Sequence, residues 1–284
     1  MSRASATAQI FSEAIDGASD LTTPAAGAEG DYWSSVVASR PPAGGSLWRA
    51  HSDQVNSALL RRWLPPLAGL RVLKTDLFDE ALAAGLYPAL APAARVVGID
   101  VSPAVVAAAR RRYAQLDAVV ADVRRLPFDD GEFDVAVSIS TLDHFESRDD
   151  LRRGLHELHR VLAPGGRLVV TLDNALNPVV ALRNRLPLRL LRSVGVVPYF
   201  VGETCGPSGL RRLLGEAGFA VEDTTCVLHC PRALGVLGAT LVERRADDGG
   251  RTRYLRFLER FERLDHAPTR NVTGYFVAAR ATRR

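Results

Sequence analysis

Three aspartates stand directly after three apolar runs that are separated by helical segments. Asp76 follows the first run, Asp100 ends the second, and Asp122 follows the third. In an open parallel sheet the carboxyl ends of the strands meet at the edge where ligands bind, so we expect the three carboxylates to lie together. A carboxylate accepts hydrogen bonds from both hydroxyls of a ribose, or from the exocyclic amine of adenine. The spacing therefore predicts a nucleoside-binding pocket.

The turn after the first run is unusual for such a pocket. Nucleotide-binding turns carry two or three glycines, which let the backbone approach the ligand closely. Here no glycine follows until Gly85, and the turn contains Asp76, Asp79 and Glu80 instead. Lys74, just before it, is the only lysine among 36 basic residues, which indicates a position where a compact ammonium fits and a planar guanidinium does not.

A histidine, His144, comes just after the fourth apolar run. An imidazole with an ordinary pKa near ~6.5 suits a general base at neutral pH. The same position also suits a side chain that only lines the pocket, and both interpretations remain open.

The elements that must position these residues alternate between strand and helix. Short apolar runs predict strands at residues 71–75, 95–99, 118–121, 133–139 and 167–172. Helix starts are indicated by Ser102, which precedes a proline, and by Ser147, which precedes two nearby aspartates. Short apolar strands separated by helices predict a parallel sheet that is covered on both faces.

The remaining segments are assigned from their composition. We expect a mobile N-terminus at 1–30, a helical cap at 31–66 that holds all three tryptophans, and one main domain at 67–284. Within that domain we expect an insertion at 174–206, a helix at 207–219, an amphipathic helix at 254–264 and two late strands near 220–229 and 273–279.

Composition limits the classes of function. The chain has 284 residues, a net charge of +4 and no apolar run of the ~18–20 residues that cross a bilayer. The N-terminus lacks the apolar stretch of a signal peptide, so we expect a cytoplasmic location. Scattered arginines without a basic block argue against nucleic-acid binding. Cys226, His229 and Cys230 lack a fourth metal ligand, so we expect buried thiols and no metal site.

Four segments resemble motifs of class I S-adenosylmethionine-dependent methyltransferases. Val97–Pro103 is similar to their second motif, and Ala121–Asp134 is similar to their third and fourth motifs. Leu155–Leu168 resembles the helix and turn before their fifth strand, and Leu210–Phe219 resembles a later helix. The resemblance implies a Rossmann-like, doubly wound α/β fold with a mostly parallel seven-stranded sheet. It also implies methyl transfer from S-adenosylmethionine to a small-molecule acceptor, at oxygen or nitrogen. The oligomeric state stays open, with a homodimer as one possibility.

The resemblance also assigns roles to single residues. Asp100 would hold the ribose, and Asp122 and Val123 would frame the adenine. The cofactor-binding set that it implies is Lys74, Asp76, Phe78, Asp100, Val101, Asp122, Val123 and Ser138. His144 would be the candidate base near the transferred methyl group. The expected substrate-binding set is Trp48, His51, Asn174 and Tyr199, although Trp48 and His51 share a helix face that could equally serve packing.

The insertion adds one more set of charged residues. Arg183, Arg185, Arg189 and Arg192 would form a solvated helix face or bind an acidic substrate. Abundant alanine and arginine with one lysine are typical of a GC-rich bacterial genome, in which small-molecule biosynthesis would be a plausible setting.

The first motif departs from the family pattern. The family usually has an acid at the position of Lys74 and glycines near Asp76, Phe78 and Glu80. S-adenosylmethionine is net positive, so an unpaired lysine would repel it. We therefore expect Lys74 to be ion-paired, to Asp76 or Asp100, with the acidic turn replacing the glycine contacts. Two alternatives remain open: a fold-retaining regulator or partner that does not methylate, and different chemistry with Lys74 as a base or nucleophile after burial lowers its pKa.

Overall fold

The computed structural model describes residues 29–38, 47–145, 147–185 and 202–284. The expectation of a mobile segment falls almost entirely outside these ranges, as does the substrate-binding role of Tyr199. Glu29 and Gly30, the last two residues of the expected mobile segment, already belong to a helix.

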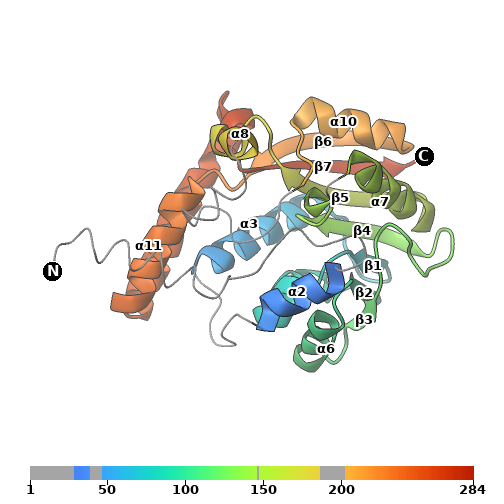
Figure 1. Cartoon of the computed structure of the whole chain (residues 1–284), viewed down its shortest axis with the longest axis horizontal. Coiled ribbons are helices and arrows are strands. Elements are labelled where there is room, and N and C mark those ends of the chain that lie inside the picture. Colours follow the sequence, from blue (N-terminus) through green and yellow to red (C-terminus); the bar gives the residue numbers. More distant parts are fainter. Residues whose placement is uncertain (1–28, 39–46, 146, 186–201) are drawn as a thin grey trace.

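A seven-stranded sheet forms the centre of the molecule, in the order β3-β2-β1-β4-β5-β7-β6 (Figure 1). Its strands are β1 (Arg71–Lys74), β2 (Arg95–Asp100), β3 (Asp117–Val120), β4 (Phe133–Ile139), β5 (Leu162–Asp173), β6 (Phe219–Val227) and β7 (Phe276–Arg283). The pairs from β3 through β5 are parallel, and β7 is antiparallel to both of its neighbours. The predicted fold class is confirmed. The chain leaves β1 toward β2 on one side and later returns to β4 on the other, which places a ligand crevice beyond the carboxyl ends of these strands.

Helices cover the sheet and extend beyond it. They are α2 (Glu29–Ala38), α3 (Leu47–Trp63), α4 (Phe78–Leu82), α5 (Tyr87–Leu90), α6 (Pro103–Arg112), η1 (Leu142–His144), α7 (Arg148–Val161), α8 (Pro178–Arg185), α10 (Pro207–Glu216), α11 (Arg232–Arg245), α12 (Asp248–Glu259), η2 (Arg260–His266) and α13 (Arg270–Thr273). The predicted caps are confirmed: the Ser102 hydroxyl accepts a hydrogen bond from the Val105 amide at 3.2 Å, and the Ser147 hydroxyl accepts one from the Asp149 amide at 3.1 Å.

Two apolar clusters lie on the two faces of the sheet. On one face Leu155 of α7 and Leu214 of α10 are completely buried. On the other face Leu60 and Trp63 of α3 and Val106 of α6 form the core. Helix α3 also supports α11 and α12, so α11 lies beside α3 and away from the sheet (Figure 1). Strand ends on a sheet that is packed from both sides are held firmly, and they can therefore position the functional side chains.

Three elements differ from the sequence predictions. Helix α11 was not predicted, because among its residues only Gly235 and Ala239 are buried and no apolar stripe marks it. Strand β5 begins at Leu162, before the Pro-Gly-Gly turn, because Leu162 already pairs with Phe133. The helix expected at 254–264 ends at Glu259 and continues as the 3₁₀ segment η2. Within the described ranges, no helix combines the length and the apolar character needed to cross a membrane.

Candidate functional site

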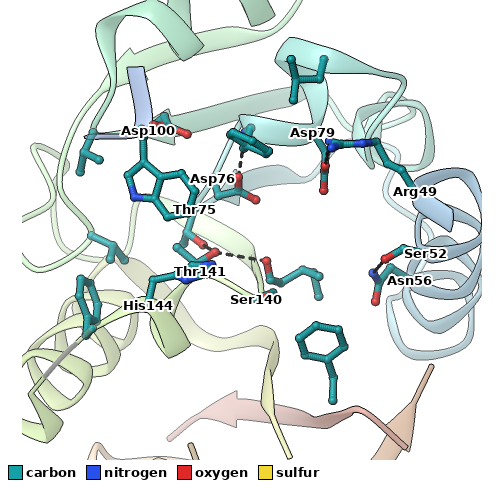
Figure 2. A pocket seen from close by; sticks show the side chains of 18 of the residues that line it. Arg49, Ser52, Asn56, Thr75, Asp76, Asp79, Asp100, Ser140, Thr141 and His144 are labelled. Carbon is teal, nitrogen blue, oxygen red and sulfur yellow. Dashed lines mark hydrogen bonds and ion pairs between the residues drawn. The ribbon is translucent and has the colours of Figure 1, made fainter. Parts of the chain in front are cut away.

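A pocket of about 570 Å³ opens at the carboxyl ends of β1 to β4 (Figure 2). Its floor has two parts, which we name here. The β2–β3 edge consists of Asp100, Val101, Asp122 and Val123, and the β1 loop consists of residues 75–82. All three aspartates predicted from the strand ends line this pocket, so the sequence rule for parallel sheets places them correctly.

Asp100 is the most deeply placed acid of the β2–β3 edge. Its side chain is 8% exposed, and one carboxylate oxygen accepts a hydrogen bond from the Ser102 amide at 2.9 Å. The other oxygen accepts one from the Leu77 amide, in the β1 loop, at 3.1 Å. Burial, followed by repulsion from Asp76, raises the pKa of Asp100 to about 7. Asp100 therefore connects the two parts of the floor through its hydrogen bonds. Its ionisation is sensitive to any charge that lies beside it.

Asp122 is held by a neighbouring arginine. The Arg124 guanidinium donates to both carboxylate oxygens, at 2.7 Å for its closest contact, and it donates to Glu29 of α2 at the same distance. The guanidinium also lies over the Phe145 ring, 4.9 Å from its centroid. This chain of ion pairs fixes the start of α2 against the β2–β3 edge.

The β1 loop is built around a buried ion pair. Lys74 and Glu80 are 3% and 0% exposed, and the Lys74 ammonium lies 2.9 Å from a Glu80 carboxylate oxygen. The ammonium also lies 3.3 Å from the Asp76 carboxylate and donates to the Asp76 carbonyl oxygen. The expected ion-pairing of Lys74 is confirmed with Asp76; Asp100 has backbone partners instead, and Glu80 is a second partner that the sequence did not indicate.

Glu80 replaces contacts that a glycine turn would make through its backbone. Its second oxygen accepts hydrogen bonds from the amides of Leu86 and Tyr87, at 2.8 and 3.1 Å. Leu77 is completely buried, and its side chain covers Gly98 of β2, where an added Cβ would meet it at 2.4 Å. The loop thus keeps its path without glycines because a carboxylate and an apolar side chain fill its interior.

Hydroxyl groups line the end of β4. Ser140 has a φ of +48°, which turns it out of the strand, and its hydroxyl donates to Asp143 at 3.1 Å. Thr75 and Thr141 have their hydroxyl oxygens 2.9 Å apart. Asp143 itself is 1% exposed, and burial, opposed by His144 and assisted by Asp173, raises its pKa to about 6. The strained backbone at Ser140 presents a hydroxyl to the pocket with a buried carboxylate behind it.

Aromatic side chains form much of the outer wall. Trp33 of α2 contacts Phe78 and His144 edge to face, with ring centroids 5.6 and 5.0 Å apart. Ser52 and Asn56 of α3 face the cavity beside the ion pair of Arg49 and Asp79 (Figure 2). Further wall residues come from α3, the end of β6, α11 and the start of β7: Trp48, Leu228, Arg232, Val236, Tyr275 and Phe276. The pocket therefore has a charged floor, and its outer wall, which we also call the roof, is partly polar and partly aromatic.

Known proteins match the same region. A family model described as a methyltransferase domain matches residues 80–170. A probable S-adenosylmethionine-dependent methyltransferase of Mycolicibacterium smegmatis is 33% identical over 158 residues, which cover 56% of this chain and 53% of that protein. The solved structure of an S-adenosylmethionine-dependent methyltransferase from Mesorhizobium loti has a TM-score of 0.51 and 22% identity, covering 80% of this chain and 96% of that one. Residues 80–170 therefore match a methyltransferase domain, and the chain is similar to class I S-adenosylmethionine-dependent methyltransferases in sequence and in fold.

A further relative in this family has a named acceptor. The demethylmenaquinone methyltransferase of Thermus thermophilus is 49% identical over 84 residues, which are 28% of this chain and 37% of that enzyme. The chain spans about half the length of the Mycolicibacterium smegmatis relative and less of the Thermus one.

Most of the residues predicted to bind the cofactor or to act in catalysis line this pocket. Those that do are Asp76, Phe78, Asp100, Val101, Asp122, Val123 and His144. Lys74 and Ser138 do not belong to the wall among the described residues: Lys74 lies behind the β1 loop, and Ser138 is completely buried with its hydroxyl oxygen 3.0 Å from that of Thr75. The hydroxyl that reaches the pocket is two residues later, at Ser140.

The predicted substrate-binding residues separate into two groups. Trp48 lines the pocket. His51 is completely buried and lies 3.6 Å from Glu262, because it faces η2. Asn174 is also buried, and its amide donates to the Gly274 carbonyl at 2.9 Å, so it fastens the end of β5 to the start of β7. Neither is part of the pocket wall among the described residues.

The expectation for the insertion is wrong at one arginine. Arg183 neither faces solvent nor reaches the pocket wall in the described part of the chain. It is buried and donates to the Asp173 carboxylate at 2.6 Å, because α8 packs back onto the end of β5. Cys226 and Cys230 are buried, as predicted.

Several residues that line the pocket were not predicted from the sequence. Ser140, Trp33 and Arg124 each line the pocket, as do the α3 residues Ser52 and Asn56. Only Arg124 carried a usable signal, since it stands two residues after Asp122, where its side chain can fold back onto that carboxylate. The positions of the other residues depend on helix packing and on the strained backbone angle of Ser140, and no local sequence pattern indicates either of them.

The donor set of the pocket fits S-adenosylmethionine. Each carboxylate oxygen has two lone pairs, so Asp100 can accept from ribose hydroxyls while it keeps its two backbone amides. Val101 and Val123 supply apolar surface for a base between the two acids. The volume of about 570 Å³ lies within the range of roughly 300–1,000 Å³ that is usual for small-molecule sites.

Proposed function

We propose that this protein transfers a methyl group from S-adenosylmethionine to a small-molecule acceptor, at oxygen or nitrogen. The observation that carries the proposal is the placement of Asp100 and Asp122 at adjacent strand ends, each followed by a valine that also lines the pocket. In this proposal Asp100 holds the ribose, and Asp122 and Val123 contact the adenine. The bound cofactor supplies an electrophilic methyl group on a sulfonium.

The chain's own residues then orient the acceptor. Trp48, Tyr275 and Phe276 offer aromatic surface, while Ser52 and Asn56 offer hydrogen-bonding groups. Such a wall suits an organic molecule with apolar or aromatic parts and a few polar groups. The Thermus relative is named for a demethylmenaquinone acceptor, which supports a small-molecule class for this chain. Holding the acceptor in line with the methyl group supplies much of the rate enhancement.

His144 is the candidate base of this proposal. It belongs to the pocket wall and touches Trp33. A base contributes only if the acceptor loses a proton during transfer, and a purely lining role would leave the rate unaffected by pH near the imidazole pKa. A His144→Gln variant assayed across pH separates the two roles, because only a base would change the shape of the pH–rate profile.

A test of the proposal starts from cofactor binding. Isothermal titration of the wild-type chain with S-adenosylmethionine is expected to give micromolar or tighter binding. Asp100→Ala should weaken it by roughly 10- to 100-fold, because a carboxylate hydrogen bond contributes roughly 1.5–3 kcal/mol. Asp117→Asn, at an exposed acid at the far end of β3, is the matched control and should leave the affinity unchanged. Absence of binding to the wild-type chain would overturn the proposal.

A second candidate function is a fold-retaining protein that does not methylate. One observation favours it: the β1 loop presents side chains where the family usually has glycines, and Phe78 and Asp79 line the pocket there. Binding of S-adenosylmethionine without turnover, in a mass-spectrometric screen of small-molecule acceptors, would support this second candidate. The different chemistry that uses Lys74 has no such support. Burial alone would lower the pKa of Lys74, but Asp76 and Glu80 outweigh it and raise that pKa above its ordinary value.

A further inference from the structure

The lysine in the first motif does not make the pocket positive. The Lys74 ammonium faces two carboxylates, at 2.9 Å from Glu80 and 3.3 Å from Asp76. One positive charge against two negative charges leaves this buried cluster with a net negative charge. The local charge is therefore opposite to what the single lysine of the sequence indicates.

The member of this cluster that faces the pocket is a carboxylate and not the ammonium. Asp76 lines the pocket, whereas Lys74 and Glu80 are buried and are not among the described residues that line it. The next acid in the loop, Asp79, also lines the pocket and is paired with Arg49. A ligand at this end of the pocket would consequently meet the Asp76 carboxylate before it met the ammonium.

Asp76 and Asp100 both line the pocket and are drawn near each other in Figure 2. Asp76 is the nearby charge that most opposes ionisation of Asp100, after the effect of burial itself. The hydrogen-bond partners of Asp100 are the neutral backbone amides of Leu77 and Ser102, and the charge of Lys74 lowers the pKa of Asp100 less than these amides do. A positive charge placed between the two carboxylates would relieve their repulsion, whereas a neutral group of the same shape would not.

We propose that Asp76 and Asp100 make this pocket selective for cationic nucleosides, so that it binds a sulfonium or ammonium nucleoside more tightly than the matching neutral thioether. This inference rests on the proposed function and adds the basis of its ligand selectivity. S-adenosylmethionine carries the sulfonium, and S-adenosylhomocysteine, which remains after methyl transfer, is the neutral thioether. After methyl transfer the positive charge is gone, so the two carboxylates would bind S-adenosylhomocysteine less tightly and the product would dissociate more easily.

The experiment compares three nucleosides by isothermal titration at pH 8 and low salt. S-adenosylmethionine and sinefungin are the cationic probes, and S-adenosylhomocysteine is the neutral probe. The cationic probes should bind about tenfold more tightly than the neutral one, and that ratio should shrink as salt is added. Sinefungin carries an amine in place of the sulfonium methyl, so it separates the effect of charge from the effect of sulfur.

Two variants locate the selectivity in the β1 loop. Asp76→Asn keeps the oxygen that accepts from the Phe78 amide but removes the charge. It should weaken the cationic probes about fivefold or more and leave S-adenosylhomocysteine within about twofold. Asp79→Asn frees the positive charge of Arg49 and should lower the same ratio. Asp130→Asn is the matched control, because this 75% exposed acid is far from the pocket wall and pairs with Arg160.

Each outcome has a defined meaning. Equal affinity of the wild-type chain for all three probes overturns the charge selectivity and leaves the proposed function standing. Loss of all binding in the wild-type chain overturns both. If Asp76→Asn weakens the charged and neutral probes equally, with its fold confirmed by circular dichroism, the residue acts through structure and the inference fails. If only the cationic probes weaken, in both loop variants, the inference is supported.

Discussion

The two parts of the pocket floor reach the same edge of the sheet by different physical means. At the β2–β3 edge, Asp100 and Asp122 are placed by strand ends and by a capped helix, as in a standard nucleotide-binding sheet. In the β1 loop, the buried pair of Lys74 and Glu80 fixes a path that glycines would otherwise permit. One part is determined by topology, and the other is determined by a specific set of side chains.

This difference teaches where each part is vulnerable. Strand ends tolerate changes on their exposed side chains, because the backbone ladder holds them. A loop that depends on a buried ion pair loses its support when either partner is removed, because the remaining charge stays buried without compensation. The β1 loop should therefore be the more sensitive of the two to single substitutions.

The largest expected effect comes from Glu80→Gln. The glutamine keeps an oxygen for the amides of Leu86 and Tyr87 but withdraws the charge that faces Lys74. We expect a loss of about 3 kcal/mol in the free energy of unfolding, because one partner of a buried pair is left uncompensated. Urea denaturation monitored by circular dichroism measures it.

The control for this change is a more exposed ion pair that joins β1, the strand of Lys74, to β4. Arg71 and Asp134 are 3.3 Å apart at the start of β1 and β4, with both side chains partly exposed. Asp134→Asn should cost less than about 1 kcal/mol. If the two variants lost equal stability, burial of the Lys74 pair would have no special importance and the contrast between the two parts of the floor would disappear.

A second effect tests how the two parts are joined. The Leu77 side chain of the β1 loop sits on Gly98 of β2, and an added Cβ at residue 98 would lie 2.4 Å from it. Gly98→Ala should lower the free energy of unfolding by about 2 kcal/mol, because it overpacks a rigid contact. Chemical denaturation of Gly98→Ala, Leu77→Ala and the double variant provides a double-mutant cycle.

The matched glycine control lies in α10. Gly215→Ala has open space around its new methyl group and sits in a helix, so it should be neutral or slightly stabilising. A large loss at Gly215, or no coupling between residues 77 and 98, would show that the contact between loop and strand does not matter.

The contrast between the two parts also explains what the sequence could predict. Asp100 and Asp122 could be placed because short continuous apolar runs locate the strands, and the parallel topology then fixes which edge their ends share. The caps at Ser102 and Ser147 were equally readable, since a capping residue acts within three residues of itself. These predictions rest on local rules.

The β1 loop and the pocket roof could not be predicted in the same way. The pairing of Lys74 with Glu80 depends on a short helix, α4, that begins inside the loop and turns the glutamate inward. The resemblance implied Ser138, which is buried; Ser140 lines the pocket instead, with a φ of +48° that no sequence pattern indicates. Trp33 reaches the pocket only through the packing of α2 on α6.

A smaller effect is expected in the pH dependence of stability. The pKa of Asp100 is about 7 in the folded protein against an ordinary 3.8, so between these values the folded state holds a proton that the unfolded state has released. The free energy of unfolding should therefore fall as pH rises from about 4 to 7. Asp100→Asn should flatten this fall in urea titrations at several pH values.

The control must carry the same change in charge without the burial. Asp117→Asn removes an exposed carboxylate at the start of β3 and should leave the slope with pH unchanged. Asp53 and Asp143 also have raised pKa values, of about 7 and about 6, so the Asp100 variant should keep part of the slope. An unaltered slope in Asp100→Asn would show that its carboxyl group is ionised at lower pH than the geometry implies.

The smallest effect concerns the ion pair between Arg124 and Asp122 at the β2–β3 edge. Its guanidinium occupies lone pairs of Asp122 that an adenine amine would use, and it also binds Glu29. Arg124→Gln should therefore tighten S-adenosylmethionine binding by about threefold, since it frees the acid and removes a positive charge near a cationic ligand. Arg152→Gln, at an exposed arginine on α7, is the control and should have no effect in the same titration. Weaker binding in Arg124→Gln would reverse the interpretation: the arginine would then support the base directly, through its position over Phe145, and the β2–β3 edge would depend on specific side chains as much as the β1 loop does.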